Sequence, residues 1–290
     1  MALQDEPPVR YGQAPQRIMV PLARIDSAGP LLDIAFYLRQ AKSEEPVHVV
    51  TVIPEGPDSQ REITSGEKIR EFAINRAASA EVPVASATRI DFNVASGVNR
   101  AVRELRISTV VLGWTGEVST SERIFGSVLD QLLDQCSEML LVCRIVNPVN
   151  TISRIVLLLP PLAEREAGFD MVQKSLRHLA DQIGASLLVL VPERGLTQVR
   201  KVMTAGTGLK PRLQAYASWE DVREELTKCT KPDDLLVLLS AREGRLSWNG
   251  DLPKLPHEMV EQFPHTSCMV IYPSEPTPAG EGKWPNGSGV

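Results

Sequence analysis

The glycines at positions 113, 116 and 126, the last followed by Ser127, are the residues of this sequence whose types and spacing best fit a chemical task. They form the pattern G-x2-G-x9-G-S. Glycine tolerates a positive φ and lets a ligand approach the backbone closely. Ser127 opens a helical run, and the first N–H groups of a helix are free to bind an anion. The pattern therefore indicates a loop that can surround a phosphate.

The segments on either side of this loop would hold it at the edge of a sheet. Residues 109–112 are apolar and predict a strand, and residues 128–136 predict a helix. Ligands of open α/β sheets bind beyond the carboxyl ends of the strands. The sequence has no G-x-S-x-G or G-x4-G-K-[ST] motif, and the loop has no lysine to reach terminal phosphates. We therefore expect binding rather than catalysis, with slow ATP hydrolysis left open.

An internal repeat organises the whole chain. Residues 17–23 and 154–163 each begin a unit with a buried strand, and the second strands, 48–55 and 186–193, both end in Pro-Glu. Helical and apolar segments then alternate as far as the final strands, 138–144 and 267–272. This order predicts two tandem, doubly wound parallel sheets of the α/β class, similar to Rossmann folds. The linker at 147–151 is short, so we expect the units to pack together as a pseudo-dimer.

The expected limits of the units follow from the same repeat. We place a flexible segment at residues 1–16, the first unit at 17–148, the second at 152–273 and a disordered tail, rich in Pro and Gly, at 274–290. The second unit carries glycines at the wrong spacing in residues 240–251, and prolines 160 and 161 end its first strand. We therefore predict one functional pocket per chain, in the first unit.

Composition restricts the class of partner. The chain of 290 residues has a net charge of −5, which argues against nucleic acid as a partner. Hydrophobic residues make up 43% and aromatic residues 5%, so the cores must be largely aliphatic. No run approaches the roughly 18 apolar residues that a membrane-spanning helix needs. The four cysteines form no metal-ligand spacing and predict buried, reduced thiols. We expect a soluble, cytoplasmic chain.

The repeat and the glycine loop together resemble the universal stress protein family, as two tandem domains over residues 17–273. The segments 17–23, 31–35 and 123–133 look like the cytosolic tails of bacterial cation/proton antiporters. The resemblance implies an adenine nucleotide ligand (ATP, ADP, AMP or a cyclic form), with Mg²⁺ as a candidate ion. Ala23 stands where the family has an aspartate that helps to hold the nucleoside, which leaves affinity and base preference open.

The resemblance also implies which residues bind the nucleotide. The adenine slot would be lined by residues at the ends of the first and second strands, and the ribose and phosphates by the glycine loop. Arg123 could reach a phosphate from within that loop. The full set is Pro21, Leu22, Ala23, Val52, Gly113, Gly116, Arg123, Gly126, Ser127 and Val128. Asp130 and Asp134 could bind Mg²⁺ from the following helix, although a solvated helix face is the simpler interpretation.

Three functions fit these observations. The first is a nucleotide-sensing regulatory module that forms the cytosolic tail of a cation/proton antiporter. Its partner would be the membrane domain of the antiporter, which would tether it to the inner membrane. The second is a free-standing tandem universal stress protein with weak or no ATPase activity. The third is a scaffold without a ligand, in which the final strands, 138–144 and 267–272, are sheet edges that pair across a homodimer.

Overall fold

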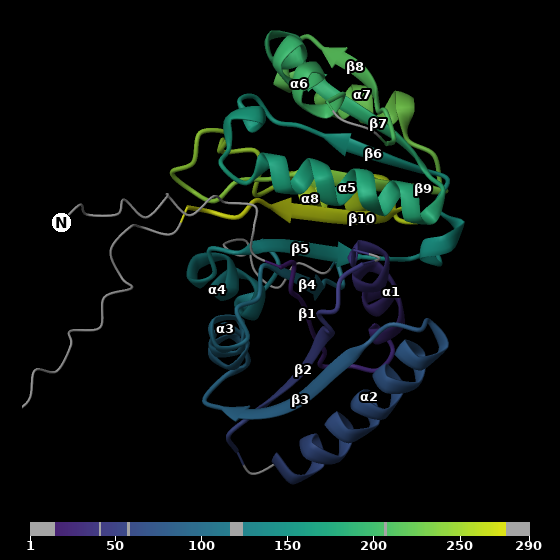
Figure 1. Cartoon of the computed structure of the whole chain (residues 1–290). Coiled ribbons are helices and arrows are strands. Elements are labelled where there is room, and N and C mark those ends of the chain that lie inside the picture. The colour runs from purple at the N-terminus through teal and green to yellow at the C-terminus, as the bar shows by residue number, and fades with distance from the viewer. Residues whose placement is uncertain (1–14, 41, 57–58, 117–123, 206–207, 277–290) are drawn as a thin grey trace, which may run out of the picture.

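The computed structural model describes residues 15–40, 42–56, 59–116, 124–205 and 208–276 (Figure 1). Their strands form one sheet with the order β3-β2-β1-β4-β5-β10-β9-β6-β7-β8. Every neighbouring pair is parallel except β5 and β10, which are antiparallel. Two parallel half-sheets thus meet along β5 and β10 in the middle of the molecule (Figure 1).

The first unit supplies the half-sheet that begins with β3. Its strands are β1 (Ile18–Pro21), β2 (Val47–Pro54), β3 (Val84–Asp91), β4 (Thr109–Gly113) and β5 (Met139–Arg144). Its helices are α1 (Ala28–Leu38), α2 (Ser59–Ser79), α3 (Val94–Glu104) and α4 (Ser127–Gln135). The apolar runs of β4 and β5 are buried almost throughout because helices cover both faces of the sheet.

The second unit repeats this order. Its strands are β6 (Arg154–Leu158), β7 (Ser186–Pro192), β8 (Arg212–Tyr216), β9 (Asp234–Leu239) and β10 (Ser267–Tyr272). Its α-helices are α5 (Phe169–Ile183), α6 (Leu196–Met203), α7 (Val222–Cys229) and α8 (Leu255–Gln262). The tandem α/β architecture predicted from the repeat is therefore confirmed.

Two largely aliphatic cores lie on opposite faces of the sheet, and both run through the two units. One contains residues of α1, α2, α5 and α6, and the other contains residues of α3, α4, α7 and α8. The equivalent helices α1 and α5 pack against each other, and the imidazole of His178 donates to the carbonyl of Arg39 at 3.1 Å. The units are therefore joined by side-chain packing as well as by the sheet.

The pairing of β5 with β10 corrects one expectation. These final strands were expected to be sheet edges that pair across a homodimer. Instead they pair with each other within the chain, from Cys268 opposite Arg144 to Tyr272 opposite Leu140. The short linker allows this because it lets the second unit turn back and satisfy the backbone groups of β5 internally. The outer strands of the sheet are β3 and β8.

Helices of the described residues are unlike membrane spans, since none combines the length and the apolar character that crossing a bilayer requires.

Candidate functional site

The glycine loop lies where two neighbouring strands end. β1 and β4 are paired, with Ile18 opposite Thr109, and they end at Pro21 and Gly113 at the same edge of the sheet. The loop continues to Gly116, and after residues 117–123, which lie outside the described residues and include Arg123, the chain enters α4 through Gly126. The structure thus brings the two ends of the motif to one edge.

Each glycine of the motif has a physical reason to be there. Gly116 has a φ of 86° and Gly126 a φ of 103°, a region that residues with a Cβ rarely adopt. At Gly113 space is limited, because a Cβ there would lie 2.9 Å from Cδ1 of Leu31 in α1, whose side chain would have to move. Backbone conformation and space therefore account for these glycines without a ligand. The lack of side chains also lets a ligand approach the backbone of the loop closely.

The start of α4 can receive an anion. No side chain caps this helix, because its N-cap is Gly126. Ser127 and Val128 are exposed, so their surroundings are open to solvent. The first N–H groups of a helix lack intrahelical acceptors, and the helix dipole adds a partial positive charge. This arrangement suits a phosphate group.

Asp130 fixes the approach to α4. Its Oδ1 accepts from the backbone N–H of Phe125 at 3.0 Å, while Oδ2 is buried and has no hydrogen-bond partner among the described residues. Asp134 is exposed. The two aspartates therefore do different things and do not form a paired site. Across the described ranges, no group of three His, Cys, Asp or Glu residues is arranged to hold a metal ion.

The residues expected to line an adenine slot lie at the same sheet edge but differ in exposure. Pro21 and Val52 are half-buried and Ala23 is exposed. Leu22 is only 3% exposed, and its N–H donates to the carbonyl of Val50 at 2.9 Å. Val52 lies under α3, where a Cβ added to Gly97 would come within 2.5 Å of its Cγ1. The side chain of Leu22 belongs to the core.

The second unit contacts the glycine loop directly, a feature that the sequence analysis missed. The indole of Trp114 is 7% exposed and packs edge-on against Phe125 and His257 of α8, with ring centroids 5.0 and 5.1 Å apart. Nε2 of His257 hydrogen-bonds the carbonyl of Ile124, so Nε2 carries the proton. Trp114 is therefore an interdomain core residue rather than a platform for a base. No local sequence signal links these positions, which are more than 130 residues apart.

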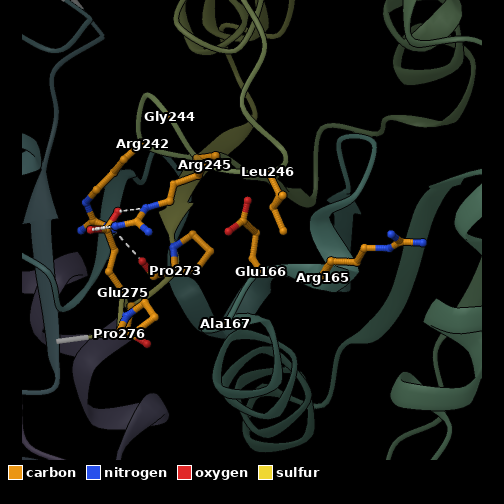
Figure 2. A pocket seen from close by; sticks show the side chains of 12 residues that line it. Arg165, Glu166, Ala167, Arg242, Gly244, Arg245, Leu246, Pro273, Glu275 and Pro276 are labelled. Carbon is orange, nitrogen blue, oxygen red and sulfur yellow. Dashed lines mark hydrogen bonds and ion pairs between the residues drawn. The ribbon is translucent and has the colours of Figure 1, made fainter. Parts of the chain in front are cut away.

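The equivalent edge of the second unit holds a pocket of about 210 Å³, next to the segments that follow β6 and β9 (Figure 2). Residues 273–276 of this chain lie across it. A Cβ on Gly168 would come within 2.6 Å of both N and O of Ser274. Ser274 to Pro276 were expected to belong to a disordered tail, but they pack here because the backbone of Ser274 fits against Gly168 and Glu275 is held by arginines.

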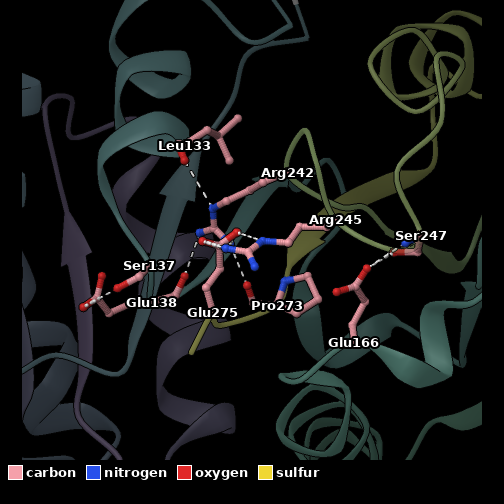
Figure 3. A network of polar contacts seen from close by, with 9 residues as sticks. All are labelled: Leu133, Ser137, Glu138, Glu166, Arg242, Arg245, Ser247, Pro273 and Glu275. Atoms are coloured by element: carbon pink, nitrogen blue, oxygen red, sulfur yellow. Dashed lines mark hydrogen bonds and ion pairs between the residues drawn. The ribbon is translucent and has the colours of Figure 1, made fainter. Parts of the chain in front are cut away.

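Arg242 and Arg245 organise the contacts of this tail segment (Figure 3). Arg245 binds the carboxylate of Glu275 with two hydrogen bonds, one of them 2.6 Å long. Arg242 donates to the carbonyls of Leu133, Glu138 and Pro273 at 3.2, 2.9 and 2.6 Å. Burial lowers the pKa of the Arg242 guanidinium.

This network also forms hydrogen bonds with the first unit. Leu133 lies in the last turns of α4, and the N–H of Glu275 donates to the carbonyl of Ser137, just beyond that helix, at 2.7 Å. α4 is therefore held at both ends: its start forms part of the glycine loop, and its end is bound by Arg242 of the second unit. The second unit's own pocket is crossed by the tail segment.

Comparisons with known proteins agree with this geometry. Residues 15–144 match the family model described as the universal stress protein family. No curated protein matches the chain. The cytoplasmic domain of a prokaryotic cation chloride cotransporter is similar in structure, with a TM-score of 0.56, 11% identity, and coverage of 90% of this chain and 96% of that domain.

Two further solved structures have a similar fold. A universal stress protein from Archaeoglobus fulgidus matches with a TM-score of 0.56 and 15% identity, over 87% of this chain and 97% of its own. A putative universal stress protein from Pseudomonas aeruginosa matches with a TM-score of 0.54 and 12% identity, over 90% of this chain and 95% of its own. At these identities the likeness shows a shared fold.

Proposed function

Residues 15–144 match the model of the universal stress protein family, and from this match we propose that the first unit is a domain of that family that binds an adenine nucleotide as a regulatory ligand. The observation that carries the proposal is the uncapped start of α4 behind Gly126, at the edge where β1 and β4 end. The phosphates would lie at Gly116, Gly126 and Ser127, and the base beside Pro21 and Val52. Which of ATP, ADP, AMP or a cyclic form binds is left to the test, as is a role for Mg²⁺.

One nucleotide per chain is the stoichiometry we propose. The first unit keeps the glycine loop, whereas in the second unit residues 273–276 cross the equivalent edge and Glu275 engages Arg245. We also propose the domain limits 17–148 and 152–273. The second unit then serves as a packing partner that contacts both ends of α4.

A regulatory role fits the groups around the loop better than catalysis does. Asp130 holds the N–H of Phe125, and His257 holds the carbonyl of Ile124. Each group thus has one polar atom bound to the backbone and its other polar atom buried, without a partner among the described residues, so both are poorly placed to activate a water molecule. A bound nucleotide can shift the molecule only through different affinity for two arrangements. The contacts of the loop with His257 of α8 and of Leu133 in α4 with Arg242 provide the route by which the second unit would respond.

We propose that this response regulates a membrane transporter, as the cytosolic module of a cation/proton antiporter tethered to the inner membrane. Support comes from the fold shared with a cation chloride cotransporter's cytoplasmic domain. A free-standing universal stress protein is the second candidate, supported by the similar extent of the Archaeoglobus protein. The in-frame coding sequence upstream of Met1 separates the two: a series of hydrophobic spans of about 20 residues supports the tethered form, and their absence contradicts it.

The nucleotide proposal is tested by titration calorimetry with AMP, ADP, ATP and cyclic AMP. The key variant is Ser127→Glu. An acidic residue in the first turn of a helix favours folding, but here it would repel a phosphate. We expect an unfolding midpoint that is unchanged or raised and at least a roughly tenfold loss of affinity, since like charges brought together cost several kcal/mol.

Gln131→Glu is the matched control. It adds the same charge to an exposed position one turn further along α4, away from the helix start. We expect nearly normal binding. If no nucleotide binds the wild-type chain, or if both variants bind equally well, the phosphate site is not at the start of α4.

A further inference from the structure

Arg144 is a cation at the glycine loop that the motif itself does not contain. It ends β5, which runs parallel to β4 with Gly113 opposite Cys143, so its side chain starts at the edge where the loop lies. A Cβ added to Gly116 would come within 3.0 Å of both Cδ and Nε of Arg144. The arginine side chain therefore runs directly against the loop's second glycine.

The guanidinium of Arg144 is only partly satisfied. Its Nη2 donates to the carbonyl of Pro264, after α8, at 3.0 Å. Its Nη1 is buried and has no hydrogen-bond partner within the described ranges. None of the ion pairs between described residues involves Arg144. A buried donor without an acceptor is costly, and more so when it carries charge. Such a group is suited to an anionic acceptor.

We propose that Arg144 binds the terminal phosphates of the nucleotide and makes the site selective for nucleoside di- and triphosphates over monophosphates. This inference rests on the proposed function, since it assumes that the nucleotide lies along Gly116. The planar fork of an arginine matches phosphate oxygens with paired hydrogen bonds, which a lysine does not reproduce. Arg144 thus supplies the positive charge that a lysine supplies in other phosphate-binding loops.

The same side chain connects the ligand to the second unit. Its hydrogen bond to Pro264 reaches the segment between α8 and β10, and Val260 of α8 would lie 3.1 Å from a Cβ on Gly116. A terminal phosphate that draws the guanidinium toward the loop would compete with the Pro264 carbonyl. Nucleotides with a terminal phosphate would then weaken the hydrogen bond to Pro264, and those without one would leave it intact, so that the position of α8 would depend on the number of phosphates.

The test compares affinities for AMP, ADP and ATP in the wild-type chain, Arg144→Gln and Arg144→Lys. A charge-assisted hydrogen bond contributes about 1.5–3 kcal/mol, so we expect Arg144→Gln to weaken ATP binding by roughly tenfold to a hundredfold. AMP affinity should change by less than about threefold. AMP lacks the terminal phosphates that Arg144 is proposed to bind, and a substitution that removes no contact with a ligand has little effect on its affinity. Arg144→Lys should lie between the two, since it keeps the charge but not the fork.

Arg212→Gln is the control for net charge. Arg212 is exposed on β8, at the outer edge of the second unit. It should leave the ATP-to-AMP ratio unchanged. If the wild-type chain binds no nucleotide, the proposed function fails and this inference with it. If the wild-type chain binds but Arg144→Gln keeps the wild-type ratio, or loses AMP and ATP affinity equally, only the role of Arg144 is overturned.

Protein stability is monitored by thermal unfolding of each variant. Should Arg144→Gln fail to fold, Arg144→Lys decides the matter, because it retains a donor for Pro264. An ATP-to-AMP ratio that Arg144→Lys leaves unchanged would contradict selection by the guanidinium fork.

Discussion

Gly97 in α3 provides a test of the packing beneath the expected adenine slot. A Cβ at this buried position would lie 2.5 and 3.0 Å from Cγ1 and Cγ2 of Val52 and 3.1 Å from Cβ of Asp91. Val52 is β-branched and stiff about χ1, so its methyl groups have little freedom to move aside. The prediction is that Gly97→Ala destabilises the chain.

The magnitude follows from two opposing effects. Gly to Ala in a helix interior stabilises by about 1 kcal/mol, whereas overpacking a core costs about 1–3 kcal/mol. The 2.5 Å approach places the cost at the upper end of that range, so we expect a net loss of about 1–2 kcal/mol. Val52→Ala removes both methyl groups. In that background Gly97→Ala should become neutral or stabilising, with a coupling of about 2–3 kcal/mol.

Urea denaturation of the four proteins of this double-mutant cycle gives the coupling from the midpoints and slopes. Gly66→Ala is the matched control: Gly66 is also buried in a helix, α2, but the nearest atom to its Cβ would be Cγ2 of Thr51 at 3.3 Å, and the next would be Cδ1 of Ile53 and Cβ of Thr51, both at 3.9 Å. We expect that substitution to be neutral or stabilising. A stabilising effect of Gly97→Ala in the wild-type background would refute the packing of α3 on Val52.

Three further predictions concern buried and half-buried polar groups. Arg242→Met should lower the free energy of unfolding by about 3 kcal/mol in urea denaturation, since three carbonyls each lose a bond worth about 1 kcal/mol; an unchanged midpoint would contradict this. Burial and Arg17 lower the pKa of His48 below its usual 6.5, so stability should fall as the pH drops through about 6.5, where the unfolded chain takes up the proton first. His48→Gln should flatten that slope, and an equal slope in both proteins would exclude His48 as its source. Burial raises the pKa of Cys136 to about 11, so mass spectrometry should find it alkylated by iodoacetamide near pH 8 only after unfolding; rapid labelling of the folded chain would show that the thiol is accessible.

The fold was accessible from the sequence because its signals are local. Short apolar runs bounded by proline predicted β1 and β6, and helical periodicity between them predicted α1 and α5. The order of these elements then left few topologies, since crossovers between parallel strands are right-handed. The pattern could not predict that β5 would meet β10, because an apolar strand can equally pair within the chain or with a second copy.

The candidate site likewise contains residues that the sequence could predict and residues that it could not. The glycines and Ser127 were predicted as site residues from their spacing, and the positive φ values of Gly116 and Gly126 explain why glycine stands at those two positions. Leu22 was expected at the slot surface but lies in the core. Whether a residue next to a strand end faces the ligand or the interior depends on the helix packed above it, and a strand-end motif does not contain that information.

The sequence by itself determined that this chain has two similar α/β units and that the G-x2-G-x9-G-S pattern lies in the first of them. Both properties depend on local sequence signals: the periodicity of apolar residues and the backbone conformations that glycine permits. Only the tertiary structure decided what surrounds that loop. Three separate contacts cross the junction of the two units, Trp114 with His257, Arg144 with Pro264 and Arg242 with Leu133, because β5 and β10 join the half-sheets edge to edge. Contacts between residues more than a hundred positions apart depend on that junction, and no local pattern specifies it.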